Sequence, residues 1–125
     1  MAIRKLLTLA AILEGATGLA LMILPQVVVR LLLGADLSGA GLALGRVAGF
    51  GLLSLGLACR PGSEPAGDRT QALQAMLAYN LLTAAYLIYL GVGGELVGKL
   101  LWPTVAIHGV LAFLFARAWF RRSSD

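Results

Sequence analysis

Four long apolar runs make up most of this sequence, and each contains one strongly polar side chain. The four are a carboxylic acid, a guanidinium, an amide and an imidazole, namely Glu14, Arg46, Asn80 and His108. Such a set can hold a proton, bind a polar ligand through hydrogen bonds or form an ion pair. An unpaired charge at mid-bilayer costs at least about 2.5–3.5 kcal/mol on insertion scales, so ionisable residues there are functional candidates.

The depth and the surroundings of these residues favour an inward orientation. At about 1.5 Å of rise per residue, all four lie within roughly 5 Å of the middle of their expected spans. Small residues lie one turn away, for example Gly18 next to Glu14, and small residues mark helix contacts in lipid. We therefore expect the side chains to meet, with Glu14 paired to Arg46 and with Asn80 and His108 completing the network.

Two interpretations of this network remain open. In the structural one it fixes the register of the helices, although interhelical polar bonds often contribute only about 0.6 kcal/mol each. In the functional one it lines a cavity for a polar ligand or a proton, and a quinone head group would suit the arginine, asparagine and histidine donors. Tyr79 and Tyr86 lie seven residues apart on one helix face. They are further candidates for the network, but helix or lipid packing explains them equally well.

The sequence does not identify a cofactor. Quinone is one candidate, whereas a haem or metal site within one chain is disfavoured because His108 has no second histidine and Cys59 is distant. No nucleotide-binding, hydrolase or metalloprotease motif is present. An enzymatic activity is therefore disfavoured, though not excluded.

The composition indicates a membrane protein. Of 125 residues, 59% are hydrophobic and only 13% are charged, and the mean hydropathy is +0.88. A soluble domain needs more charge on its surface, and a disordered chain contains fewer apolar residues. The net charge of +4 comes from residues that flank the apolar runs, as topology signals do, so nucleic acid is not an expected partner.

The apolar runs predict a single all-α domain over residues 1–125, an integral membrane bundle of four transmembrane helices. The expected spans are about 5–24, 40–59, 70–90 and 96–119, with a hydrophilic connection at 60–69. Pro25 ends the first span, because proline cannot continue a helix ladder. The segment 26–33 is too short to cross a bilayer, so we expect a short interfacial helix in which Arg30 reaches the head groups.

Three glycines in the second span, Gly41, Gly45 and Gly49, form a GxxxGxxxG pattern. In lipid such a pattern allows a neighbouring helix to approach closely. We therefore expect these glycines to serve helix packing.

Basic residues predict the orientation of the spans. Two of those outside the membrane core, Arg30 and Lys99, fall on one side. Seven fall on the side of both termini: Arg4, Lys5, Arg60, Arg69, Arg117, Arg121 and Arg122. Because the more basic side faces the cytoplasm, we expect both termini to be cytoplasmic.

Residues 46–58 follow the pattern R-x-x-G-x-x-x-L-x-x-G-x-x, and residues 18–25 read GLALMILP. These stretches resemble small, uncharacterised DoxX-like bacterial membrane proteins. The resemblance implies a four-helix membrane fold in the bacterial cytoplasmic (inner) membrane, and some such proteins are linked to quinone or thiol redox systems. The single cysteine of this chain leaves no pair for thiol chemistry, so only Arg46 and the glycines that follow it carry over.

Three functions remain compatible with the sequence. The first is a small membrane protein whose polar cluster binds a ligand such as a quinone or relays a proton. The second is a non-catalytic accessory subunit of a larger membrane complex, and the third is an oligomeric transporter or channel. The expected partners are the lipid bilayer and either further copies of this chain or a larger complex.

Overall fold

The computed structural model describes residues 2–62 and 69–122, which are all-helical apart from short connections. Its helices are α1 (Ile3–Ile23), α2 (Pro25–Leu33), α3 (Gly39–Ala58), α4 (Thr70–Gly93) and α5 (Leu101–Arg122). All except α2 are long and apolar enough to cross a membrane. The prediction of an all-α chain with four candidate spans is thus confirmed. Most of the hydrophilic connection expected at 60–69 lies outside the described residues.

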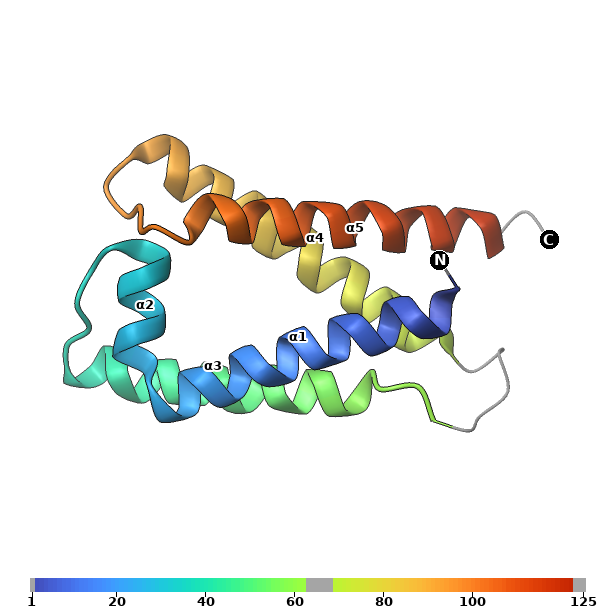
Figure 1. The fold of residues 1–125 in the computed structure, drawn as a ribbon, viewed down its shortest axis with the longest axis horizontal. Helices are drawn as coiled ribbons and strands as arrows, with labels where there is room; N and C mark the ends of the chain where they lie inside the picture. Colours follow the sequence, from blue (N-terminus) through green and yellow to red (C-terminus); the bar gives the residue numbers. More distant parts are fainter. Residues whose placement is uncertain (1, 63–68, 123–125) are drawn as a thin grey trace.

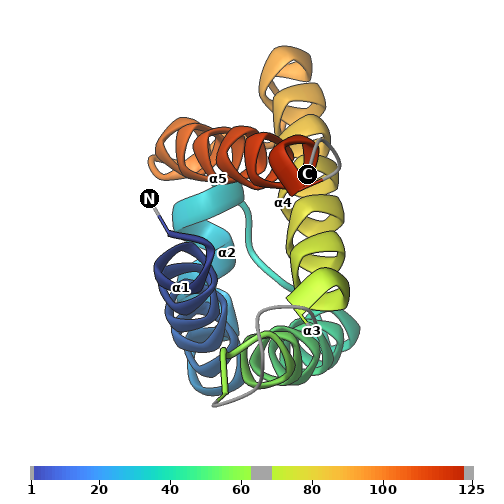
Figure 2. The ribbon, with the colours of Figure 1, turned by 90° about the vertical axis from the view of Figure 1, so that its right-hand side faces the viewer.

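The long helices form two antiparallel pairs, α1 with α3 and α4 with α5 (Figure 1). The start of α1 and the end of α5 lie at one end of the molecule, and α2 lies across the other end. There α2 contacts α1, α3 and α5, so it links the two pairs. Viewed from the end that holds the termini, α4 is steeply inclined to the other long helices (Figure 2).

The α1–α3 pair is held by contact between the two backbones. Gly18 of α1 and Gly49 and Gly56 of α3 are buried in this contact. A Cβ atom at Gly49 would lie 2.7 Å from the Gly18 carbonyl oxygen, and one at Gly56 would lie 2.7 Å from the Ala11 carbonyl oxygen. Only glycine permits such an approach, which is how helices commonly associate in lipid.

The other two glycines of the GxxxGxxxG pattern have different neighbours. A Cβ atom at Gly45 would meet the Pro25 side chain at 3.1 Å, and one at Gly41 would meet Leu37 at 3.0 Å. Gly49 therefore lies in the α1–α3 contact, whereas Gly41 packs against the chain that enters α3 and Gly45 packs against the start of α2.

Two helices have boundaries that differ from those of the predicted spans at the end of the molecule where α2 lies. The last span begins at Leu101 instead of residue 96, and α4 continues to Gly93 instead of residue 90. The amides of Gly98 and Leu100 donate to the carbonyl oxygens of Leu32 and Leu31, at 3.0 and 2.8 Å. These bonds satisfy carbonyls that the end of α2 would leave unpaired, and they keep residues 94–100 out of helix.

A closed apolar core fills the half of the bundle near the termini. Leu6, Leu7 and Ala10 of α1 pack there with Leu73 and other buried residues of α4 and α5. Towards α2, the packing of the two helix pairs against each other is looser. Thr17 of α1 is exposed there, and Leu24, which directly follows α1, is 54% exposed. The two helix pairs are therefore tightly joined over only part of their length.

Exchange of Gly49 for alanine tests the α1–α3 contact. We expect Gly49→Ala to destabilise the folded protein by about 1–3 kcal/mol, the usual cost of overpacking, because backbone atoms of α1 stand where the methyl group would go. Gly51→Ala is the matched control, since nothing lies within 4 Å of a Cβ atom there. Unfolding of the detergent-solubilised protein measures both, and equal stability of the two variants would contradict this packing.

Candidate functional site

The structure places four polar side chains together where the closed core ends: Glu14 of α1, Tyr79 and Asn80 of α4, and His108 of α5. Glu14 is only 2% exposed and Asn80 is fully buried, while Tyr79 and His108 are half-buried. We call these four residues the polar cluster. Three of them are residues that the sequence nominated for an intramembrane network, and the fourth, Tyr79, was a further candidate.

Asn80 fixes the orientation of the His108 ring. The Asn80 amide nitrogen donates to the Met76 carbonyl oxygen at 2.8 Å, so its oxygen faces the His108 Nδ1 atom, also at 2.8 Å. An amide oxygen can only accept, so His108 Nδ1 carries the hydrogen in this bond. The other ring nitrogen, Nε2, is then left to accept or carry a proton.

Tyr79 joins the two helix pairs. Its ring meets the His108 ring edge-on, with centroids 5.7 Å apart and planes at 80°. Its hydroxyl also lies close to the side chains of Glu14 and Thr83. Tyr79 therefore contacts polar side chains of both helix pairs.

Glu14 has an unusual environment for a carboxylic acid. Its Oε1 atom is buried without a hydrogen-bond partner, and the Tyr79 side chain lies beside the carboxyl. In the described part of the chain, no basic group forms an ion pair with it. Burial of an unpaired carboxylate is very costly, so we expect Glu14 to be protonated and neutral.

The structure does not support the expected ion pair between Glu14 and Arg46. Arg46 is exposed on α3, and the two side chains form no salt bridge. The reason is geometric, because α3 presents its glycines to α1. In this antiparallel pair Gly56 lies beside Gly15, whereas Gly49 lies beside Gly18. Arg46 precedes Gly49 on α3, so along the helix axis it lies well away from the level of Glu14.

Tyr86 also lies outside the polar cluster. It is 61% exposed and stacks on Tyr89, with ring centroids 6.1 Å apart. Tyr86 lies two turns beyond Tyr79 on α4, which diverges from α1 towards the end where α2 lies (Figure 1). The two tyrosines therefore share a helix face but not an environment.

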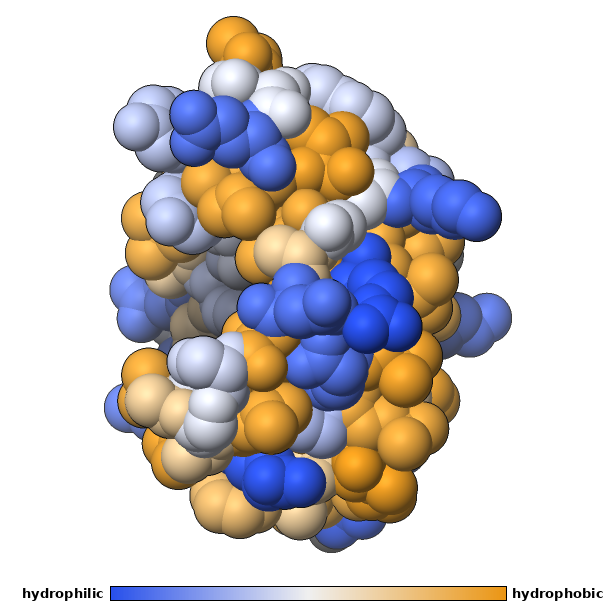
Figure 3. Space-filling view, turned by 90° about the vertical axis from the view of Figure 1, so that its left-hand side faces the viewer, coloured by the Kyte–Doolittle hydropathy of each residue, from blue (hydrophilic) through white to orange (hydrophobic). Residues whose placement is uncertain are grey.

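A second polar group at the α2 end was missed by sequence reasoning. Arg30 forms an ion pair with Asp36 at 2.6 Å, although the sequence led us to expect it at the lipid head groups. Gln26 donates to the same Asp36 oxygen at 2.7 Å and accepts from the Leu37 amide at 3.0 Å. The spacing of Arg30 and Asp36 across a glycine turn was the available signal. Hydrophilic side chains gather over this end of the molecule (Figure 3).

The chemistry of the polar cluster is that of hydrogen bonds and protons. It offers a carboxyl, a phenol, an amide and an imidazole, and residues 2–62 and 69–122 contain no group of three His, Cys, Asp or Glu side chains placed to hold a metal ion. Comparison of the chain with protein-family models, curated proteins and solved structures gives no match. The function must therefore be argued from the cluster itself.

A double-mutant cycle tests the link between Asn80 and His108. We expect Asn80→Ala and His108→Ala to show a coupling free energy of about 0.6–1.7 kcal/mol, the range found for interhelical polar bonds in membranes. Reversible unfolding of the single and double variants in mixed micelles measures it. Strict additivity would mean that the two side chains do not interact in the folded protein.

Proposed function

We propose that this chain is a small multi-pass membrane protein whose polar cluster binds the polar head group of a small apolar ligand, such as a quinone, and exchanges a proton with it. The observation that carries the proposal is the buried Glu14 carboxyl, whose Oε1 atom has no partner. A buried polar atom without a hydrogen bond costs about 1–3 kcal/mol, and a ligand can supply the missing bond. A network serving stability alone would be expected to satisfy it.

The donors and acceptors of the polar cluster suit a carbonyl or hydroxyl head group. A protonated Glu14 donates to a ligand carbonyl and, once deprotonated, accepts from a ligand hydroxyl. His108 Nε2 can take up or return the proton, because the Nδ1 hydrogen is held by Asn80 at 2.8 Å. The electrons for any reduction of a quinone would come from a redox partner, so this chain needs only to bind the ligand and move the proton.

The loosened half of the bundle supports access of a ligand from the bilayer. Beyond Glu14, Thr17 of α1 is exposed, and so is Leu24, which directly follows α1. On α4 the exposed Tyr86 follows Tyr79, and on α5 Ile107, next to His108, is 47% exposed. The polar cluster therefore borders apolar surface that a ligand tail can cover.

The distribution of charge supports a location in the bacterial cytoplasmic membrane with both termini in the cytoplasm. Seven basic residues belong to the side of the termini and two to the other side, as the positive-inside rule requires. In this orientation α2 lies at the outer surface of the membrane, where its apolar residues and its Arg30–Asp36 pair would lie between lipid and water. The resemblance to DoxX-like proteins supports the bacterial assignment.

A binding titration with a short-chain ubiquinone tests the proposed function. We expect the wild-type protein in lipid nanodiscs to bind it saturably, and we expect Glu14→Gln and Tyr79→Phe to weaken binding by about tenfold or more. Loss of one hydrogen bond to a charged or polar centre is worth roughly 1–3 kcal/mol, which corresponds to such a factor. Equilibrium dialysis of the ligand measures the dissociation constant.

Tyr86→Phe is the matched control, because it removes the same hydroxyl from the same helix at an exposed position outside the polar cluster. It should bind like the wild type. Absence of saturable binding by the wild-type protein, or equal losses in Tyr79→Phe and Tyr86→Phe, would overturn the proposal.

A second candidate function, an accessory subunit of a larger membrane complex, is favoured by Arg46. This arginine is exposed at the eighth residue of the 20-residue α3, beside the exposed Val47 and Phe50. A guanidinium facing lipid at this depth is costly, and a partner chain with an acidic or polar group would relieve that cost. If the wild-type protein binds no quinone and is recovered from its membrane with other polypeptides, this second function is the better account.

A further inference from the structure

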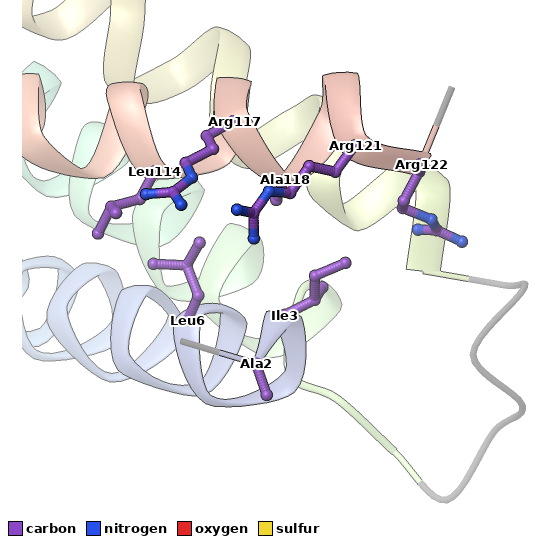
Figure 4. A pocket seen from close by; sticks show the side chains of 8 residues that line it. All are labelled: Ala2, Ile3, Leu6, Leu114, Arg117, Ala118, Arg121 and Arg122. Carbon is purple, nitrogen blue, oxygen red and sulfur yellow. The ribbon is translucent and has the colours of Figure 1, made fainter. Parts of the chain in front are cut away.

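A pocket of about 360 Å³ lies between the start of α1 and the end of α5 (Figure 4). Its floor is apolar and includes Ile3, Leu6 and Leu114. Its polar wall consists of arginines from α5, namely Arg117, Arg121 and Arg122. The pocket lies at the opposite end of the bundle from α2 and does not include any residue of the polar cluster.

Two of the arginines extend into the same space. Arg117 and Arg121 are one turn apart on α5, and their side chains extend towards the start of α1 (Figure 4). Arginines in the last turn of a helix are favoured by its dipole, and this accounts in part for Arg121 and Arg122. It does not account for Arg117, which lies more than a turn before the end of α5.

The pocket lacks anionic groups of its own among the described residues. The first turn of α1 contains no acidic residue, and no side chain caps the amides at its start. Arg117 and Arg121 form no ion pair within the described part of the chain, where the only salt bridge joins Arg30 to Asp36 at the far end. Uncapped helix amides together with the guanidinium groups of Arg117 and Arg121 are a strong environment for an anion.

We propose that this pocket binds the phosphate of an anionic phospholipid, with the acyl region of the lipid lying on Leu6 and Leu114. The combination of a cationic wall with an apolar floor fits an amphiphilic anion better than a fully hydrated one. Planar guanidinium groups bind phosphate oxygens in pairs, which is why arginine is favoured at such sites. The proposal rests on the membrane location of this chain but not on quinone binding.

Native mass spectrometry of the full-length protein, released from nanodiscs of defined lipid composition, tests the pocket. With equal amounts of phosphatidylglycerol and phosphatidylcholine, we expect the wild type to retain phosphatidylglycerol preferentially. The double variant R117Q/R121Q should lose at least tenfold of this retention. The matched control is R4Q/K5Q, which removes two exposed basic residues at the same end that do not line the pocket, and it should behave like the wild type.

Competition with inorganic phosphate distinguishes a lipid from a free anion. If millimolar phosphate does not displace the lipid, the bound group is the lipid head group, as proposed. If phosphate displaces it and alone raises the melting temperature in detergent, the pocket is a site for a soluble phosphate and the lipid proposal fails.

Three further outcomes would overturn the proposal: equal retention of the two lipids by the wild type, equal retention by R117Q/R121Q and the wild type, or an equal loss in R4Q/K5Q. If the double variant fails to accumulate, the proposal is tested by the lipid preference of the wild type and by lipid retention in the single variant R117K. R117K keeps the charge but loses the paired hydrogen bonds, so its retention should fall by several-fold. Quinone binding should be unchanged in these variants, so failure here is distinct from failure at the polar cluster.

Discussion

The contact between the backbones of α1 and α3 determines what the remaining surface of α1 can do. Gly18, Gly49 and Gly56 bring the two helices together, and this fixes the rotation of α1 about its axis. Residues rotated away from that contact then face α4 and α5, among them Leu6 and Ala10 in the core. Glu14 lies between the two faces, which is why a carboxyl group is buried at the junction of the two helix pairs.

The two halves of the bundle differ in how their interiors are packed. Near the termini, the two helix pairs are joined by apolar packing among Leu6, Leu7, Leu73, Met76 and Phe115. Towards α2 the pairs are connected mainly through α2 itself, and α1 and α4 diverge (Figure 1). The polar cluster lies at the boundary. The closed half can supply the stability, while at the boundary the Glu14 Oε1 atom is buried without a hydrogen-bond partner, an observation that supports the proposed binding site.

The sequence predicted the elements better than it predicted their contacts. Apolar run length identified four candidate spans, and Pro25 marked the end of the first of them, because both signals are local. The expected Glu14–Arg46 pair is not formed because the register between α1 and α3 depends on which glycines meet. Gly56, and not Arg46, lies at the level of Gly15, and sequence position within each span does not reveal that register. Likewise, the start of α5 at Leu101 depends on hydrogen bonds to α2, which is distant in sequence. The pocket lined by Arg117 was not predicted, because basic residues at the ends of apolar runs are interpreted as signals of membrane orientation.

The central claim is that Glu14 is a protonated, neutral carboxyl group that can form a hydrogen bond with a bound ligand. Infrared spectroscopy of the full-length protein in lipid nanodiscs at neutral pH, with 13C-labelled glutamate, tests it by comparing the wild type with Glu14→Gln. We expect a protonated-carboxyl band that is absent from the variant and that shifts when a short-chain ubiquinone is added. If the two proteins differ only in their carboxylate bands, Glu14 is ionised and the account is contradicted.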